Sequence, residues 1–310
     1  MKGKILVSDT VHESLMPMLQ EIGYEAHYQP SIKREEILNV LSQYVGIVVR
    51  SKTPIDKELM IAGTNLHFIL RSGAGLDQID LEYAEESDIS ILNAPEGNRD
   101  AVAEHAIGMI LCILNKLHTG DAEVRDGKWD REGNRGRELG TMTVGIVGCG
   151  FMGQAFAKRL PAFGCRILGY DKYKTGYGNE YLKETTLEQI NEEADLVSFH
   201  LPLTSETRFY IDDAFISNFR KPFYFLNTAR GELIKFETLV KHLKSGKILG
   251  AALDVLENEK FQKFTDEQKS TFSMLKSMPN VIFSPHVAGW THESYIKINQ
   301  TLVNKLKTLK

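Results

Sequence analysis

Short apolar, β-branched runs alternate with helix-length amphipathic stretches along almost the whole chain of 310 residues. The first hundred residues contain the runs KILVSD, VGIVVRS, LHFILRSG and ISILNAP, and later come TVGIVG, RILGYD, DLVSFH, FYFLNT, ILGAALDV and VIFSPH. Helical periodicity appears between them, for example over 34–43, 152–163 and 235–246. Nearly continuous apolar strands separated by helices predict parallel sheets that are covered on both faces. Because the chain is longer than one hydrophobic core usually serves, we expect an α/β protein with two doubly wound domains.

The charge pattern excludes two classes of partner. The formal net charge is −4, and no dense block of Lys and Arg occurs, so neither nucleic acid nor an anionic membrane is an expected partner.

The most apolar helix, predicted over 101–118, is interrupted by Glu104, His105 and Asn115, so we expect it to be buried rather than to span a membrane. The start, MKGKILVSD, lacks a signal-peptide core, and the three cysteines have no CxxC pairing. A cytoplasmic protein with reduced thiols is expected.

A nucleotide fingerprint lies in TVGIVGCGFMGQAFAKRL, where Gly148, Gly150 and Gly153 form G-x-G-x-x-G between a predicted strand and a predicted helix. The first glycine permits a tight turn, the second lets backbone approach a pyrophosphate, and the third lets helix and strand pack closely. Asp171 ends the next predicted strand, where a carboxylate accepts hydrogen bonds from a ribose 2′-hydroxyl and repels a 2′-phosphate. The pattern predicts NAD rather than NADP as the cofactor.

Three chemically complementary residues each follow a predicted strand in the second half of the chain: Arg230, Glu259 and His286. Taken singly, they could be a surface ion pair, a solvated acid and a structural histidine. Together they offer a cation for a carboxylate, a proton carrier and an acid that orients it, which is what redox chemistry on a hydroxy acid needs. Since ligands of open α/β sheets bind beyond the carboxyl ends of strands, we expect the three to converge.

The chain resembles the NAD-dependent D-2-hydroxyacid dehydrogenase family over nearly its whole length. The matching stretches are RSGAGLDQID (71–80), NAPEGNRDAVAEHA (93–106), GCGFMG (148–153), HLPLTSETR (200–208), LNTARGELI (226–234), GAALDVLENE (250–259) and SPHVAGWT (284–291). The resemblance implies a flavodoxin-like substrate domain, formed by 1–98 and 291–310, and a Rossmann domain over 99–290. It also implies a homodimer formed largely through 99–140. The polar segment 119–140 is either a solvated connector or a dimerisation arm, and Trp129 favours the arm.

The resemblance also assigns roles to individual residues. The family's catalytic arginine, glutamate and acid–base histidine fall on Arg230, Glu259 and His286. Its cofactor contacts fall on the three fingerprint glycines and on Phe151, Met152, Asp171, Leu201, Pro202, Thr228, Ala229, Asp254 and Gly289. The backbone amides of Ser72, Gly73, Ala74 and Gly75 are expected to help hold the substrate carboxylate. No metal is expected.

The sequence departs from the family pattern at two positions. Many members carry Pro after the catalytic glutamate, whereas this chain has Lys260 and the charged loop KFQKFTDEQKS. Many also carry a small residue where Trp290 stands. A Trp beside the catalytic histidine would narrow the pocket or cover the nicotinamide.

The substrate is less constrained than the family. Arg50 with Ser51, Arg71, and Arg131 after Trp129 match arginines that face the substrate phosphate in the phosphoglycerate dehydrogenase branch. A pair of guanidinium groups suits a phosphate. We therefore expect oxidation of 3-phosphoglycerate to 3-phosphohydroxypyruvate, a step of serine biosynthesis. Because the chain ends at Lys310, a short form without a C-terminal regulatory domain is expected.

Other functions stay open from the sequence. A hydroxypyruvate or glyoxylate reductase is the nearest enzymatic alternative, and a D-lactate-type dehydrogenase follows. An NAD(H)-sensing binding protein or corepressor-like relative, without significant turnover, represents a different class.

Overall fold

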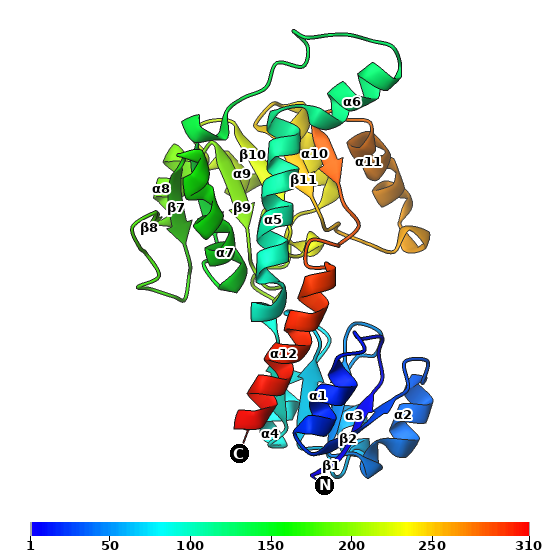
Figure 1. Cartoon of the computed structure of the whole chain (residues 1–310). Helices are drawn as coiled ribbons and strands as arrows, with labels where there is room; N and C mark the ends of the chain where they lie inside the picture. The colour runs from blue at the N-terminus through cyan, green and yellow to red at the C-terminus, as the bar shows by residue number, and fades with distance from the viewer. Residues whose placement is uncertain (1, 310) are drawn as a thin grey trace. The chain divides into compact units, whose positions relative to one another are not determined.

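The computed structural model describes residues 2–309, which form two compact units (Figure 1). The first unit comprises residues 2–99 together with 290–309, and the second comprises residues 100–289. The first unit is therefore built from two separate stretches of the chain.

Five strands and their connecting helices make up the first unit. They are β1 (Gly3–Val7), α1 (Leu15–Glu21), β2 (Tyr24–Tyr28), α2 (Arg34–Val40), η1 (Leu41–Gln43), β3 (Gly46–Val49), α3 (Lys57–Ala62), β4 (Phe68–Arg71), α4 (Leu81–Glu86), β5 (Ser90–Asn93) and the late helix α12 (His292–Thr308). All strand pairs are parallel, in the order β2-β1-β3-β4-β5. This order is the flavodoxin-like one.

Alternate residues of the first sheet feed two separate cores. Ile47 and Ile69 pack on one face with the α2 and α3 side, whereas Val48 and Leu70 pack on the other face with α1 and α12. Successive strand residues point to opposite faces, which explains why these strands read as unbroken apolar runs. The packing brings the two separate stretches of the chain together, since α12 lies against α1 (Figure 1).

The second unit contains seven strands. Its elements are α5 (Pro95–Leu114, begun in the first unit), α6 (Leu117–Arg125), η2 (Leu139–Thr141), β6 (Thr143–Val147), α7 (Phe151–Arg159), η3 (Leu160–Phe163), β7 (Arg166–Tyr170), β8 (Leu182–Glu184), α8 (Leu187–Glu193), β9 (Leu196–Phe199), α9 (Asp213–Ser217), β10 (Phe223–Asn227), η4 (Gly231–Leu233), α10 (Phe236–Lys244), β11 (Ile248–Leu253), η5 (Phe261–Lys263), α11 (Asp266–Lys276) and β12 (Val281–Phe283). All pairs are parallel, in the order β12-β11-β10-β9-β6-β7-β8. This is the Rossmann order with one added strand.

The strand order reverses between β6 and β9, which are neighbours in the second sheet. One face of this sheet packs on α5 through Met109, Ile110 and Ile113, and the other packs on a phenylalanine-rich core. Ligands of doubly wound sheets bind beyond the carboxyl ends of the strands at such a reversal. The predicted fold class, two doubly wound parallel sheets, is confirmed.

Three local features differ from the sequence expectation. The prediction missed β2 and β8, both edge strands: β2 is half polar and β8 is three residues long. The helix predicted over 101–118 is instead two helices, because α5 ends at Leu114 and Lys116 has φ +53°, a left-handed conformation that interrupts an α-helix.

Within residues 2–309, no helix combines the length and apolarity that crossing a membrane requires.

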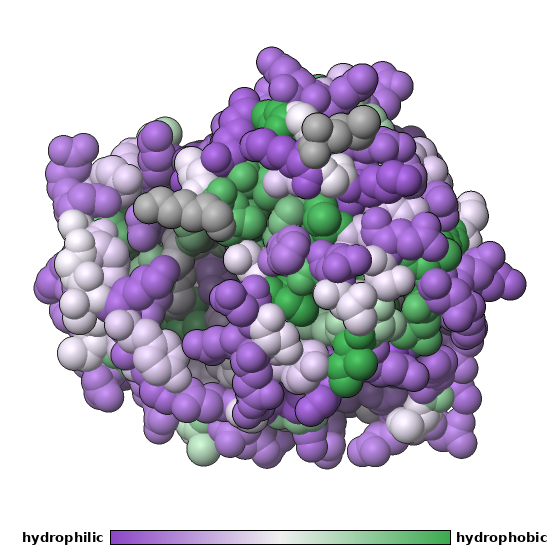
Figure 2. Space-filling model, turned by 90° about the horizontal axis from the view of Figure 1, so that it is seen from below, coloured by the Kyte–Doolittle hydropathy of each residue, from purple (hydrophilic) through white to green (hydrophobic). Residues whose placement is uncertain are grey.

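The surface is largely polar, with apolar exceptions. Hydrophilic residues cover most of the face shown in Figure 2. Trp129, in the segment between α6 and η2, is 78% exposed, and Leu117 and Val124 of α6 are also exposed. An aromatic side chain with this exposure is typical of an interaction surface.

Candidate functional site

A glycine-rich turn joins β6 to α7 at the carboxyl edge of the second sheet. Gly148 has φ +95°, and a Cβ there would lie 2.6 Å from the carbonyl oxygen of His200, so the turn requires glycine. Beside Gly150 the space is open, since a Cβ would meet only the Lys174 ammonium at 3.8 Å. No side chain caps the N-terminus of α7, which begins at Phe151. Uncapped helix amides beside open glycine backbone fit a phosphate group.

Two more residues at this edge fit a dinucleotide. Thr228 follows β10 and is buried, and its hydroxyl oxygen has no hydrogen-bond partner among the described residues. Leaving a buried hydroxyl unpaired costs about 1–3 kcal/mol, so a bound polar ligand would satisfy it. Leu201 follows β9, and its methyl group would lie 3.2 Å from a Cβ on Gly148. Because all strands are parallel, β6, β9 and β10 present these residues at the same edge of the sheet.

Asp171 connects the glycine-rich turn to the loop after β7. One carboxylate oxygen accepts a hydrogen bond from the Cys149 amide at 2.9 Å, and the other accepts from the amides of Tyr173 and Lys174 at 3.0 Å each. Burial raises the pKa of the Cys149 thiol to about 12, so this cysteine stays neutral and fills space. The carboxylate of Asp171 is thus fixed in orientation beside the turn.

A second carboxylate lies in the same neighbourhood. Lys172 pairs with Glu206 at 2.8 Å, and the Tyr173 hydroxyl donates to the same carboxylate. The hydrogen bond from Lys172 lowers the pKa of Glu206, and Glu206 raises the pKa of Lys172. Lys172 therefore has a partner within the protein and is not held ready for a phosphate.

The turn that carries Arg230 is organised by the residue that ends β10. Asn227 is fully buried, and its side chain donates to the Arg230 carbonyl at 2.9 Å and accepts from the Ala229 amide at 3.0 Å. Arg230 itself is half-buried, and one of its guanidinium nitrogens donates to the Ala229 carbonyl at 2.7 Å. The stretch LNTAR thus folds into a turn that places Arg230 at the carboxyl edge of the sheet.

The predicted histidine and glutamate form a contact pair. Nδ1 of His286 lies 2.9 and 3.0 Å from the two carboxylate oxygens of Glu259. The two side chains are 48% and 45% exposed, so both remain open to solvent or a ligand. An imidazole whose Nδ1 is held by a carboxylate presents Nε2 as the nitrogen that can exchange a proton with a substrate.

A buried aspartate holds the loop that carries His286. The Asp254 carboxylate accepts from the Ser284 hydroxyl at 2.5 Å and from the amides of Val287 and Ala288 at 2.9 Å each. The His286 amide donates to the Asp254 carbonyl at 2.7 Å, which holds His286 at φ +54°. A left-handed conformation costs a non-glycine residue about 1–2 kcal/mol, and these bonds offset that cost.

His105 on α5 also supports this loop, a role that the sequence reading missed. Its Nε2 lies 2.8 Å from the Ser284 hydroxyl and 3.6 Å from the Asp254 carboxylate. A polar residue in a largely apolar stretch is the signal that the sequence offers for His105, but nothing in the sequence indicates its partners.

In the first unit, Arg71 ends β4 and lies over the loop that follows. Its guanidinium donates to the Ser72 carbonyl at 3.0 Å, and a Cβ on Gly73 (φ +141°) would collide with it at 1.6 Å. The amides of Ser72 and Gly73 donate to the carbonyls of Val49 and Arg71 at 2.8 Å each. The sequence predicts that the backbone amides of four residues in this loop face a ligand. Because the amides of Ser72 and Gly73 are bonded to carbonyl oxygens, the prediction now applies to the amides of Ala74 and Gly75.

In the same unit, Arg50 directly follows β3, and two aromatic side chains contact its guanidinium. Its guanidinium lies 4.0 Å from the ring centroid of Trp290 and 5.0 Å from that of Tyr295, and it donates to the Tyr295 hydroxyl at 2.5 Å. Its amide donates to the buried Asp9 carboxylate at 2.5 Å. Stacking occupies the faces of a guanidinium and leaves in-plane N–H groups for an anion. The contact between Arg50 and Tyr295 is not among those that the sequence predicts.

The other predicted residues lie in loops or at the start of a helix. Phe151 is exposed and Met152 half-buried in the first turn of α7, the Pro202 carbonyl accepts from Thr207, Gly289 ends the second unit, and Ser51 is exposed. The side chain of Arg131 makes no hydrogen bond or ion pair within the described part of the chain, and it lies in the exposed segment after Trp129. Over residues 2–309, no group of three or more His, Cys, Asp and Glu side chains is arranged to hold a metal ion.

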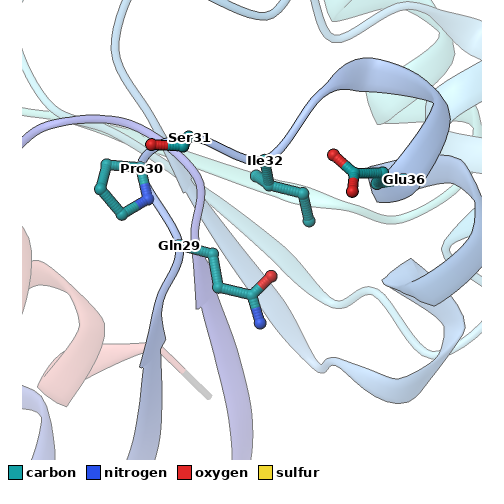
Figure 3. A pocket seen from close by; sticks show the side chains of 5 residues that line it. All are labelled: Gln29, Pro30, Ser31, Ile32 and Glu36. Atoms are coloured by element: carbon teal, nitrogen blue, oxygen red, sulfur yellow. The ribbon is translucent and has the colours of Figure 1, made fainter.

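A hollow of about 300 Å³ lies elsewhere, where β2 leads into α2. It is lined by Gln29, Pro30, Ser31, Ile32 and Glu36 (Figure 3). The Lys52 ammonium holds this loop by donating to the carbonyls of Ser8, Pro30 and Ile32 at 2.6, 2.7 and 2.9 Å. These contacts use all three N–H groups of the ammonium, so Lys52 has a structural role here.

Comparison with known proteins gives a consistent family. A family model described as the NAD-binding domain of D-isomer specific 2-hydroxyacid dehydrogenases matches residues 107–288. The chain is 34% identical to a D-3-phosphoglycerate dehydrogenase of Methanocaldococcus jannaschii, over 98% of this chain but 57% of that protein. It is 35% identical to a hydroxypyruvate reductase of Thermotoga maritima, over 89% of this chain and 88% of the reductase.

A solved structure agrees. The D-lactate dehydrogenase of Aquifex aeolicus, determined with NAD and lactic acid, is 27% identical with a TM-score of 0.82 and covers 98% of this chain and 94% of its own. The chain belongs to the D-isomer specific 2-hydroxyacid dehydrogenase family, and its second unit contains the family's NAD-binding domain.

Proposed function

We propose that the protein is an NAD-dependent D-2-hydroxyacid dehydrogenase in which His286 transfers the proton. The observation that carries the proposal is the pairing of His286 Nδ1 with both oxygens of Glu259, on a loop that Asp254 fixes in a strained conformation. A histidine with only a structural role would need neither the carboxylate nor the exposure.

Each of the three residues has a distinct task. In oxidation, Nε2 of His286 accepts the C2 hydroxyl proton of the substrate, and Glu259 stabilises the resulting imidazolium. Arg230 binds the substrate carboxylate and polarises the oxygen on C2. When bound, NAD accepts the hydride that leaves C2, so the carbinol carbon is oxidised and the nicotinamide is reduced.

The residues around Asp171 support NAD over NADP. The Asp171 carboxylate accepts hydrogen bonds from ribose hydroxyls and repels a 2′-phosphate. Glu206 adds a second negative charge and already pairs with Lys172, so that lysine does not compensate a phosphate. The Thr228 hydroxyl and the open space at Gly150 accommodate the rest of the cofactor.

For the substrate we propose 3-phosphoglycerate, oxidised to 3-phosphohydroxypyruvate. Arg50 directly follows β3 and Arg71 ends β4 in the first sheet, and a guanidinium group binds the oxygens of a phosphate or carboxylate bidentately. Curated relatives with this activity match nearly the whole chain, although the chain spans 57–58% of the first two of them. We assign the amides of Ala74 and Gly75 to the substrate carboxylate.

A hydroxypyruvate or glyoxylate reductase is the second candidate. Trp290 and Tyr295 already contact Arg50, which limits the room for a phosphate at this arginine. The hydroxypyruvate reductase relative also matches the chain over 88% of its own length.

For assembly, we propose a homodimer through the segment around Trp129, whose 78% exposure would be removed by a partner.

The test follows nicotinamide absorbance with purified protein. 3-Phosphoglycerate, glycerate and D-lactate are offered with NAD, hydroxypyruvate, glyoxylate and pyruvate with NADH, and each is repeated with the NADP form. The proposal expects specific turnover of 3-phosphoglycerate with NAD, and at least a tenfold rise of KM in Arg71→Ala. Equal or better reduction of unphosphorylated hydroxypyruvate would instead support the second candidate. Absence of turnover with every acid would overturn both.

A further inference from the structure

The loop that carries Glu259 is held by a hydrogen-bond network. Glu259 and Lys260 are both exposed, and Lys260 has φ −100°. The preceding residues nevertheless have defined partners. The neighbouring Glu257 and Asn258 supply them, through Gln268 on α11.

Glu257 joins three elements. One oxygen of its carboxylate accepts from the Phe236 amide at 2.6 Å and so caps α10, whose own N-cap residue, Lys235, provides no side-chain cap. The other oxygen accepts from the Gln268 side-chain amide at 2.9 Å. The backbone of Glu257 also packs on the arginine turn, because a Cβ on Gly231 would lie 2.7 Å from the Glu257 amide nitrogen.

Gln268 completes the network from α11. Its side-chain oxygen accepts from the Asn258 side chain at 3.2 Å and from the Thr265 amide at 3.2 Å. Asn258 in turn accepts from the Lys260 amide at 3.0 Å. Gln268 therefore holds the residues on both sides of Glu259, directly through Asn258 and Glu257 and indirectly through Lys260. The two helices that it connects, α10 and α11, lie against each other (Figure 1).

We infer that Gln268, acting with Glu257, is a positioning residue for the Glu259–His286 pair. The Glu259 side chain is exposed, and within residues 2–309 its carboxylate forms a hydrogen bond or ion pair with no side chain other than that of His286. The position of this carboxylate therefore depends on the contacts of the residues that flank Glu259. The inference rests on the proposed function, because it assigns a supporting role in the same proton transfer.

The test compares Gln268→Ala with the control Thr265→Ala. Thr265→Ala removes the hydroxyl that caps α11 by accepting a hydrogen bond from the backbone N–H of Gln268. It leaves the hydrogen bonds between the Gln268 side chain and the side chains of Glu257 and Asn258 intact. Both single variants lose helix capping, so thermal unfolding should show similar decreases in Tm.

Activity should separate the variants. For 2-keto acid reduction, Gln268→Ala is expected to lower kcat about tenfold, with NADH binding unchanged by fluorescence titration. Thr265→Ala should stay within twofold of the wild type.

Equal losses of kcat in Gln268→Ala and Thr265→Ala would overturn the positioning role. A crystal structure of each variant provides a readout without turnover: the distance from His286 Nδ1 to Glu259 should exceed hydrogen-bonding range only in Gln268→Ala. An unchanged distance there overturns the inference. A wild type that reduces no 2-keto acid overturns the proposed function, and the distance measurement still decides the inference.

Discussion

Two histidines of the second unit follow strands of similar sequence, but the environments of their side chains differ. His200 follows β9 in DLVSFH, and His286 follows β12 in VIFSPH. The ring of His200 packs on Phe156 with centroids 5.6 Å apart, and its Nε2 contacts the Ser198 hydroxyl at 2.8 Å. Burial without a neighbouring charge lowers the pKa of His200 to about 4. His286 instead is half-exposed beside the carboxylate of Glu259.

This difference shows that a position after a strand does not decide what a histidine does. Burial beside neutral groups keeps His200 uncharged at neutral pH, where it can pack and accept or donate one hydrogen bond. A carboxylate partner and access to solvent let His286 take up and release a proton. The same residue type therefore has a structural role at one strand end and a proposed catalytic role at another.

The largest expected effect comes from His286→Asn, which removes the proton carrier and keeps a polar side chain. We expect kcat for 2-keto acid reduction to fall about 10³-fold, within the usual range for loss of general acid–base catalysis. Binding of NADH, measured by fluorescence, should be unchanged. A variant that keeps more than a tenth of the wild-type kcat would remove the distinction between the two histidines.

Glu259→Gln sharpens the comparison, because it makes the environment of His286 neutral like that of His200. We expect kcat to fall about 50-fold, which corresponds to about 2.3 kcal/mol. Binding of NADH, measured by fluorescence, should be unchanged. A variant that keeps the wild-type kcat would mean that Glu259 takes no part in the proton transfer.

His200→Asn tests the structural histidine through stability. The pKa of His200 is about 4 in the folded protein and about 6.5 when unfolded, so at intermediate pH the unfolded state binds the additional proton. The wild type should lose about 2 kcal/mol more unfolding free energy than His200→Asn between pH 8 and pH 5. Urea denaturation at both pH values measures the difference, and equal losses would contradict a neutral buried ring.

Strong local patterns made much of the fold predictable. Buried central strands read as apolar runs, and ten of the twelve strands carry that signal. The two that were missed, β2 and β8, lie at sheet edges, where one side of a strand lacks a partner and polar residues are tolerated. The break at Lys116 depends on a backbone conformation that the surrounding leucines do not reveal.

For the candidate site, sequence indicated which residues matter more clearly than what holds them. The pairing of His286 with Glu259 follows from two motifs, but the buried support from Asp254, Ser284 and His105 joins segments up to 179 residues apart. Likewise, Arg50 contacts Tyr295 from the other stretch of the first unit. Contacts of this range depend on packing, and side-chain type alone does not specify them.

By itself, the sequence determined the alternation of strands and helices, the glycine-rich turn and the kinds of group available for chemistry. These depend on local rules: hydrophobic period, backbone freedom at glycine and the charge of a side chain. Only the tertiary structure decided which groups meet. It left His200 without a charged partner and placed His105 and Asp254 beside Ser284, because such contacts form when elements that are distant in the sequence pack together.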